Sequence, residues 1–183
     1  LSAWGNDTTG EVNLNGGLFA ANRVEMAAGA AFHFNDGRLA VKDFYTYGGV
    51  GTLEQKGGTL APGFSRSETS LAGPSTIHGS YSLLAGGVLE IELFSTGYDQ
   101  LHVTDSVTLA GALDLQLNYS PAVGDQFMVI ETLGDDPITG QFAGLSELDT
   151  LDSDYLGSTY RFQISYLSFL GGNDVVLKMI EKL

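Results

Sequence analysis

The chain has 183 residues, 43% of them hydrophobic, with 22 acidic against 8 basic side chains and a formal net charge of −14. This length suits one domain with a sizeable core, and the hydrophobic content excludes a disordered chain. The absence of cysteine excludes disulfides, a cysteine-ligated zinc site and a cysteine nucleophile. The acidic balance argues against nucleic acid and anionic lipid as partners, since both are negatively charged.

The compartment is expected to be extracellular, at or near a bacterial cell surface. The chain begins LSAWGNDTTG rather than with methionine, which we interpret as a mature or trimmed product whose leader has been removed. No apolar run approaches the roughly 20 residues of a membrane span, so no membrane insertion is expected.

The first two thirds of the chain favour strands over helices. The best helical window, residues 21–31, is interrupted by Gly29. Alternation by two is frequent: in residues 111–119 (GALDLQLNY) leucines alternate with polar side chains. Such alternation is typical of strands with one buried and one wet face. The sequence therefore predicts an all-β fold.

A longer period overlies this alternation. Small or glycine pairs precede a leucine in NGGLF (15–19), DGRLAV (36–41), GGTLAPG (57–63), GGVLEI (86–91) and AGALDL (110–115). Leu18, Leu39 and Leu60 are 21 residues apart, and Leu89 and Leu113 follow after 29 and 24. A recurrence of 20–30 residues predicts a right-handed parallel β-solenoid with glycine at its corners and these leucines stacked inside.

From about residue 120 the pattern changes. We predict solenoid coils over residues 1–120 and an antiparallel, β-rich cap over 121–183, in one continuous domain. The cap should contain an acidic loop near residue 150, then strands at 160–167 and 174–180 that form a hairpin around a glycine turn.

The chain resembles the autotransporter-associated β-strand repeat family. The resemblance rests on the order of several fragments along one chain, including GTLEQKGGTLAPG, GGVLEIEL, GYDQLHVTDSVTLAGALDLQL, PAVGDQFMVIET and FQISYLSFLGGNDVVLKM. It implies a parallel β-solenoid in a bacterial surface or secreted protein, with a structural or adhesive role. It carries no catalytic motif to this chain.

Catalysis is not expected. Polysaccharide-cleaving β-helices generally need clustered carboxylates together with arginine or lysine, and no base lies between Arg66 and Arg161. Several acids in this stretch are expected at outward strand positions or at corners, as ordinary surface charges, although two of them on adjacent coils would suit a glycosidase pair. These acids are Glu90, Glu92, Asp99, Asp105 and Asp114.

Two binding hypotheses remain open. Asp149, Asp152 and Asp154 are a candidate Ca²⁺ loop, weighed against a simple solvated acidic loop. An aromatic group is a candidate surface for stacking a glycan, weighed against core packing. Its members are Trp4, Phe44, Tyr45 and Tyr47. No other cofactor is expected.

The ends of the solenoid are the expected assembly sites. The first coil should leave unpaired backbone groups, which proteins usually cover. Its partner is expected to be another copy, in a homopolymer, or the rest of a longer solenoid. The last strand is a candidate for donation to a neighbour. The proposed interface comprises Leu1, Trp4, Val12, Leu14, Val175, Leu177 and Met179. The sequence thus favours a non-enzymatic structural protein over a carbohydrate-binding or carbohydrate-cleaving β-helix. Head-to-tail stacking or strand donation would build such a protein into filaments.

Overall fold

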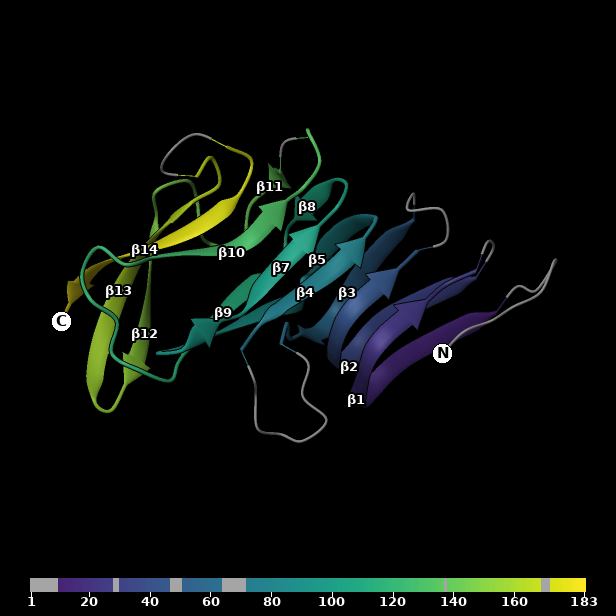
Figure 1. Cartoon of the computed structure of the whole chain (residues 1–183), viewed down its shortest axis with the longest axis horizontal. Coiled ribbons are helices and arrows are strands. Elements are labelled where there is room, and N and C mark those ends of the chain that lie inside the picture. The colour runs from purple at the N-terminus through teal and green to yellow at the C-terminus, as the bar shows by residue number, and fades with distance from the viewer. Residues whose placement is uncertain (1–9, 28–29, 47–50, 64–71, 137, 169–171) are drawn as a thin grey trace.

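The computed structural model describes residues 10–27, 30–46, 51–63, 72–136, 138–168 and 172–183. These residues form strands and connections without a helix, which confirms the all-β prediction (Figure 1). The strands are β1 (Glu11–Glu25), β2 (Ala31–Tyr45), β3 (Thr52–Leu60), β4 (Pro74–His78), β5 (Ser80–Phe94), β6 (Gly97–Tyr98), β7 (Gln100–Val103), β8 (Val107–Leu109), β9 (Ala112–Leu117), β10 (Gln126–Thr132), β11 (Thr139–Gly140), β12 (Thr150–Tyr155), β13 (Ser158–Ser165) and β14 (Val175–Lys182).

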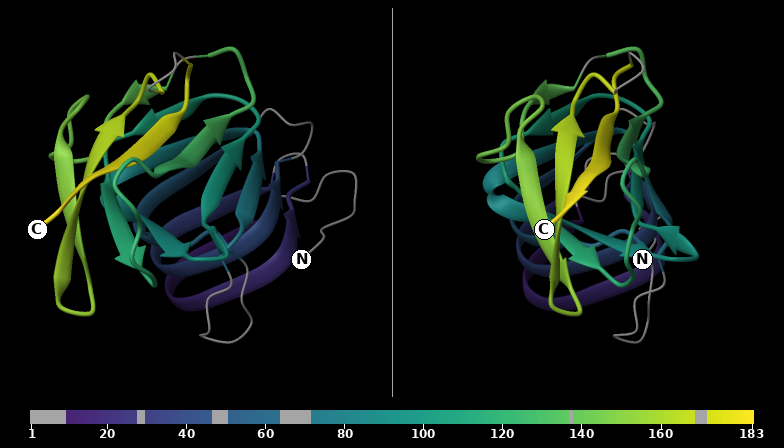
Figure 2. Two further views of the ribbon diagram at one scale, coloured as in Figure 1. Left: turned by 60° about the vertical axis from the view of Figure 1, so that its left-hand side comes forward. Right: turned by 90° about the vertical axis from the view of Figure 1, so that its left-hand side faces the viewer.

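Most of the sheet is built from parallel pairs. The strands β1, β2, β3 and β5 lie side by side in that order, and β5 then pairs with both β8 and β9. A second parallel row runs from the end of β2 through β4 and β7 to β10. The long strands bend strongly, so the rows form one curled, open sheet around a common interior (Figure 2).

The C-terminal part of the sheet is antiparallel, so the sheet as a whole is mixed. β10 pairs with β14, β14 with β13, and β13 with β12, each antiparallel. The predicted antiparallel pairing of the last two strands is confirmed. Parallel pairing nevertheless continues beyond residue 120, because β10 pairs with β7 and β11 with β8.

The interior is lined by columns of aligned side chains. One column takes the second residue after each bend glycine, and its members are Phe19, Leu39, Leu60, Leu89 and Leu113. The prediction that Leu18 belongs to it was wrong: Leu18 pairs with Arg38 and is 53% exposed. In β1 the glycine that corresponds to Gly37 is Gly17 rather than Gly16, so the inward residue is Phe19 rather than Leu18.

The bend glycines are required by close contact between neighbouring strands. A Cβ on Gly58 would lie 2.4 Å from the carbonyl oxygen of Gly37, and a Cβ on Gly37 would lie 2.6 Å from that of Gly17. The backbone φ angles of Gly37 and Gly58 are also positive, at 89° and 71°. Only glycine accepts both conditions without strain, which confirms its predicted place at the corners.

The acidic segment near residue 150 is a strand rather than the predicted loop. In β12 the half-buried Leu151, Ser153 and Tyr155 alternate with exposed residues, including Asp152 and Asp154. The strand pairs along its whole length with β13. Its inward alternation therefore outweighs the turn-forming tendency of its aspartates.

Candidate functional site

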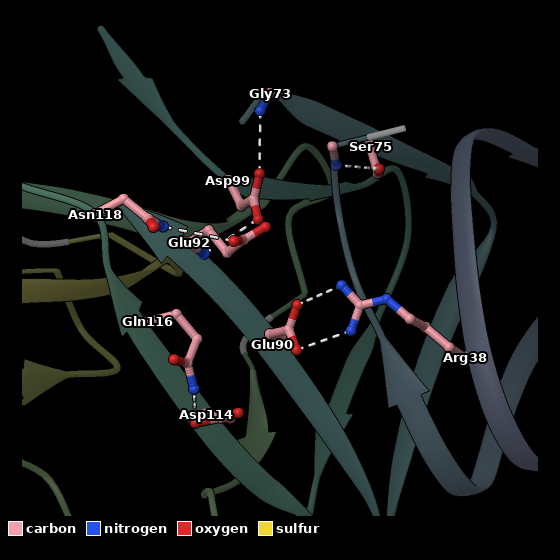
Figure 3. A network of polar contacts seen from close by, with 10 residues as sticks. Arg38, Gly73, Ser75, Glu90, Glu92, Asp99, Asp114, Gln116 and Asn118 are labelled. Atoms are coloured by element: carbon pink, nitrogen blue, oxygen red, sulfur yellow. Dashed lines mark hydrogen bonds and ion pairs between the residues drawn. The ribbon is translucent and has the colours of Figure 1, made fainter. Parts of the chain in front are cut away.

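A polar cluster lies on the outward side of β5 (Figure 3). Glu90 and Glu92 alternate with the buried Ile91 and Leu93, so they point away from the core. The Arg38 guanidinium, on β2, donates two hydrogen bonds to the Glu90 carboxylate, at 2.8 and 2.5 Å. These bonds raise the pKa of Arg38 above its usual value. The pair links strands that are separated by β3.

Asp99 is the most buried member of this cluster, at 0% exposure. Asp99 lies at a corner between β6 and β7, which is one of the two predicted placements, but its carboxylate is buried rather than a surface charge. Its Oδ1 accepts a hydrogen bond from the Gly73 amide and its Oδ2 one from the Glu92 amide, both at 3.1 Å. Burial raises the pKa of Asp99 to about 7, with nearby Glu92 and Glu90 adding to the rise and the two amide bonds opposing it.

The local chain path explains this position. After β5 the chain turns back, and β6 pairs antiparallel with the end of β5, so that Leu93 lies opposite Tyr98. The next backbone bond runs from the Asp99 amide to the Glu92 carbonyl, at 2.9 Å. The Asp99 carboxylate in turn accepts a hydrogen bond from the Glu92 backbone amide. In an antiparallel ladder a backbone carbonyl would normally be the acceptor.

Glu92 is only partly satisfied. Its Oε1 accepts a long hydrogen bond from the Asn118 side chain, at 3.5 Å, while Oε2 is buried and has no hydrogen-bond partner among the described residues. Desolvation raises the pKa of Glu92, and the charge of Glu90 adds to this rise while Arg38 opposes it. The cluster therefore holds two neighbouring carboxyl groups that both resist ionisation.

The outward acids do not present an open carboxylate pair. Asp99 is buried, and Glu90 is occupied by Arg38. Asp105 accepts a hydrogen bond from Ser80 at 2.9 Å, and Asp114 one from Gln116 at 2.8 Å. Acid catalysis of glycoside cleavage needs carboxyl groups that reach the sugar. The contacts of this cluster instead hold strands together.

The candidate Ca²⁺ residues have partners within the protein. Asp152 accepts two hydrogen bonds from Arg161, both at 2.8 Å, and these lower the pKa of Asp152. Asp154 accepts one from Thr159 at 2.5 Å, and Asp149 accepts the Ser146 amide at 2.7 Å. Over the described ranges, no three acidic or histidine side chains are grouped as metal ligands.

The candidate glycan-stacking aromatics do not form one patch. Phe44 is buried in the core, whereas its neighbour Tyr45 points outward. One face of the Tyr45 ring stacks on His78, with 3.7 Å between ring centroids, and the Arg23 guanidinium lies 4.1 Å from its centroid. Trp4 and Tyr47 lie outside the described residues.

The edge of β1 is the second notable feature. Within the described part of the chain β1 pairs with β2 alone, which leaves its other edge open. Leu14 closes the interior there with 7% exposure, and Val12 beside it is half-buried. The other two predicted interface residues at this end, Leu1 and Trp4, lie outside the described residues.

The opposite end of the fold is covered. The Ser153 hydroxyl, on β12, donates a 2.7 Å hydrogen bond to the Leu115 carbonyl of β9, so the β12–β13 hairpin lies against β9. β14 lies between β10 and β13. Its residues Val175, Leu177 and Met179 are 0 to 1% exposed. The structure thus places these three in the core, apart from Val12 and Leu14.

The comparisons with known proteins do not identify the chain. No protein-family model matches it, and no curated protein or solved structure matches it significantly. Among the described residues, no helix is long and apolar enough to cross a membrane. The functional argument therefore rests on the two features above, the polar cluster and the open edge of β1.

Proposed function

We propose that the chain is a non-enzymatic structural module, a right-handed parallel β-solenoid that extends a longer stack by accepting further parallel strands on the open edge of β1. The observation that carries this proposal is the difference between the two ends. The antiparallel strands β12–β14 lie across the C-terminal end and β12 is bonded there to β9, while the fifteen-residue β1 has no second neighbour in the described part of the chain. Proteins usually cover such edges, since unpaired backbone groups attract other strands.

Two features of β1, the Asn15 side chain and the bend at Gly17, support a parallel occupant. The Asn35 side-chain amide donates a 2.8 Å hydrogen bond to the Asn15 oxygen, so the Asn15 amide group is placed to continue the ladder outward. Amide ladders of this kind stabilise stacked parallel strands. Gly17 has a φ of 72°, and a Cβ there would meet no atom within 4 Å. At the corresponding Gly37 and Gly58, this position lies against the bend carbonyl of the preceding strand.

The covered C-terminal end favours one of the possible occupants. A head-to-tail homopolymer would need a second copy to offer a free parallel edge, but β12 and β14 lie across that end. Donation of β14 would remove its buried core residues from between β10 and β13. Both routes cost more than adding solenoid coils to β1. We therefore favour the rest of a longer solenoid as the partner.

Extracellular placement belongs to the same proposal. Its support is the resemblance to the autotransporter-associated repeat family, together with the net charge of −14 and the absence of cysteine. An acidic surface keeps such a protein soluble and away from anionic lipid. A carbohydrate-binding or carbohydrate-cleaving role has less support, because Asp99 is buried, Glu90 is bound by Arg38, and one face of Tyr45 is covered by His78.

A tandem duplication tests the proposal. A second copy of residues 10–51 would be placed before Gly10, so that the added β2 reaches the edge of the original β1. We expect the added residues to give dispersed amide signals in NMR spectra and to increase the free energy of unfolding, because each stacked repeat adds an interface with its neighbour.

The matched control is Gly17→Ala in both the original and the duplicated chain. In the original chain the added Cβ meets open space, so the cost is about 1–2 kcal/mol of backbone strain. In the duplicated chain it should also clash with the added bend carbonyl and cancel most of the gained stability. Disordered added residues, with unchanged unfolding energy of the rest, would overturn the proposal.

A further inference from the structure

The Glu92–Asp99 pair closes a hairpin that also holds the start of β4. The pair sits where β5 leaves the parallel sheet, next to the backbone bond between the Asp99 amide and the Glu92 carbonyl. The Asp99 carboxylate connects this hairpin to Gly73, which directly precedes β4. The Ser75 hydroxyl continues the connection by donating to the Val41 carbonyl at 2.6 Å. One buried carboxyl group thus bridges β5 and the approach to β4.

The charges around Asp99 are unbalanced. Glu90 and Glu92 lie on β5, and Arg38 on β2 is the single cation that acts on them in the described part of the chain. Arg38 is committed to Glu90 by two hydrogen bonds. The neighbouring strand β9 aligns Asp114 with Glu90 and the neutral Gln116 with Glu92. Full ionisation would leave three carboxylates, Glu90, Glu92 and Asp99, near the one guanidinium of Arg38 in a poorly solvated place.

We propose that the Glu92–Asp99 pair retains a proton near neutral pH, and that its loss loosens the hairpin and the Gly73 contact, which makes the pair a pH-sensitive latch. A neutral carboxyl group still accepts the two amide bonds with its oxygens and adds an O–H donor. The Glu92 Oε2, buried without a partner, is an acceptor that lacks such a donor. A charge on this buried oxygen is costly because no donor contacts it, and a bound proton reduces that cost.

The direction of the effect follows from linkage. Because the folded pair binds its proton more tightly than hydrated carboxyl groups do, the closed latch is fully favoured below the usual carboxyl pKa. Its advantage is lost as the pH rises toward the folded pKa of Asp99, about 7. Within that window the open population should grow by up to about tenfold for each pH unit, and it should level off above it.

NMR titration of the intact protein tests the latch. The amide signals of Gly73 and Glu92, which donate to Asp99, should shift together with a midpoint near neutral pH. Their hydrogen exchange, relative to the intrinsic rate, should accelerate over the same range. In Glu92→Gln one negative charge is removed, so the midpoint should fall and exchange at pH 7 should slow.

Two further variants keep the test decisive. Glu54→Gln removes an exposed acid on β3 and should leave the midpoint unchanged. Asp99→Asn cannot titrate and should abolish the pH dependence of exchange at Gly73, even where the variant is less stable. The proposal is overturned if both amides follow a midpoint near the usual carboxyl value, or if Glu92→Gln leaves the midpoint where it was.

Discussion

At the scale of single residues, Gln55 shows how a polar side chain can belong to an apolar column. It is fully buried and aligned between Phe34 and Leu83. Its Oε1 accepts a hydrogen bond from the Tyr81 hydroxyl at 2.6 Å, and its Nε2 donates to the carbonyls of Gly58 and Val88 at 2.8 and 3.0 Å. Burial raises the pKa of Tyr81 and keeps this donor neutral.

Replacing Gln55 by leucine should therefore destabilise the fold, although leucine matches the rest of the column. The change leaves the buried Tyr81 hydroxyl and two carbonyls without their partner, at about 1–3 kcal/mol for each unpaired group. Denaturant unfolding of Gln55→Leu measures the loss. Adding Tyr81→Phe removes the orphaned hydroxyl and should recover part of it. Equal stability of Gln55→Leu and the unmodified chain would contradict this account.

The same scale shows what the sequence could and could not predict. Alternation placed Leu39, Leu60 and Leu89 inside because burial depends on local periodicity. Leu18 was misplaced because two adjacent glycines offer two alignments, and the register with β2, which sets Phe19 opposite Leu39, is a tertiary contact. The burial of Asp99 and the Arg38–Glu90 pair depend on tertiary contacts between distant residues, so no local pattern indicated them.

At the scale of elements, β12 and β13 form a hairpin that also pairs with β14. Arg161 joins Asp152 across the hairpin and lies 3.8 Å from Glu181 of β14. The glycine turn in the sequence predicted the antiparallel pairing of β13 with β14, which is observed, whereas the aspartates of β12 predicted a loop. Aspartate favours turns, and only pairing with β13 outweighs this tendency.

This hairpin leads to a prediction about calcium. The carboxylates of Asp149, Asp152 and Asp154 already accept hydrogen bonds from the protein, whereas Ca²⁺ requires six to eight free oxygen ligands, roughly. We expect millimolar Ca²⁺ to raise the melting midpoint no more than Mg²⁺ at the same ionic strength. A larger rise with Ca²⁺ that disappears in Asp152→Asn would show that the segment rearranges into a calcium site.

At the scale of the whole molecule, two titrations act in opposite directions on stability. Asp152 has a pKa lowered by Arg161, so its contribution is present above the usual value of 3.8 and is lost as the pH falls. Asp99 has a raised pKa, so its contribution is present below that value and is lost as the pH rises toward about 7. The net charge of −14 adds repulsion on the alkaline side.

The free energy of unfolding should therefore be greatest at about pH 4 to 5, near the usual carboxyl pKa. It should decline as the pH rises to about 7, and above that only general repulsion should lower it further. Denaturant unfolding across this range measures the profile. Added salt at pH 8 should recover the stability that is lost to general repulsion, because screening acts on exposed charges. It should not recover the stability that is lost when the buried Asp99 ionises. Asp99→Asn should flatten the alkaline decline and leave the acid side unchanged. A maximum at pH 8 in the unmodified chain would show that buried carboxyl groups do not govern the stability of this fold.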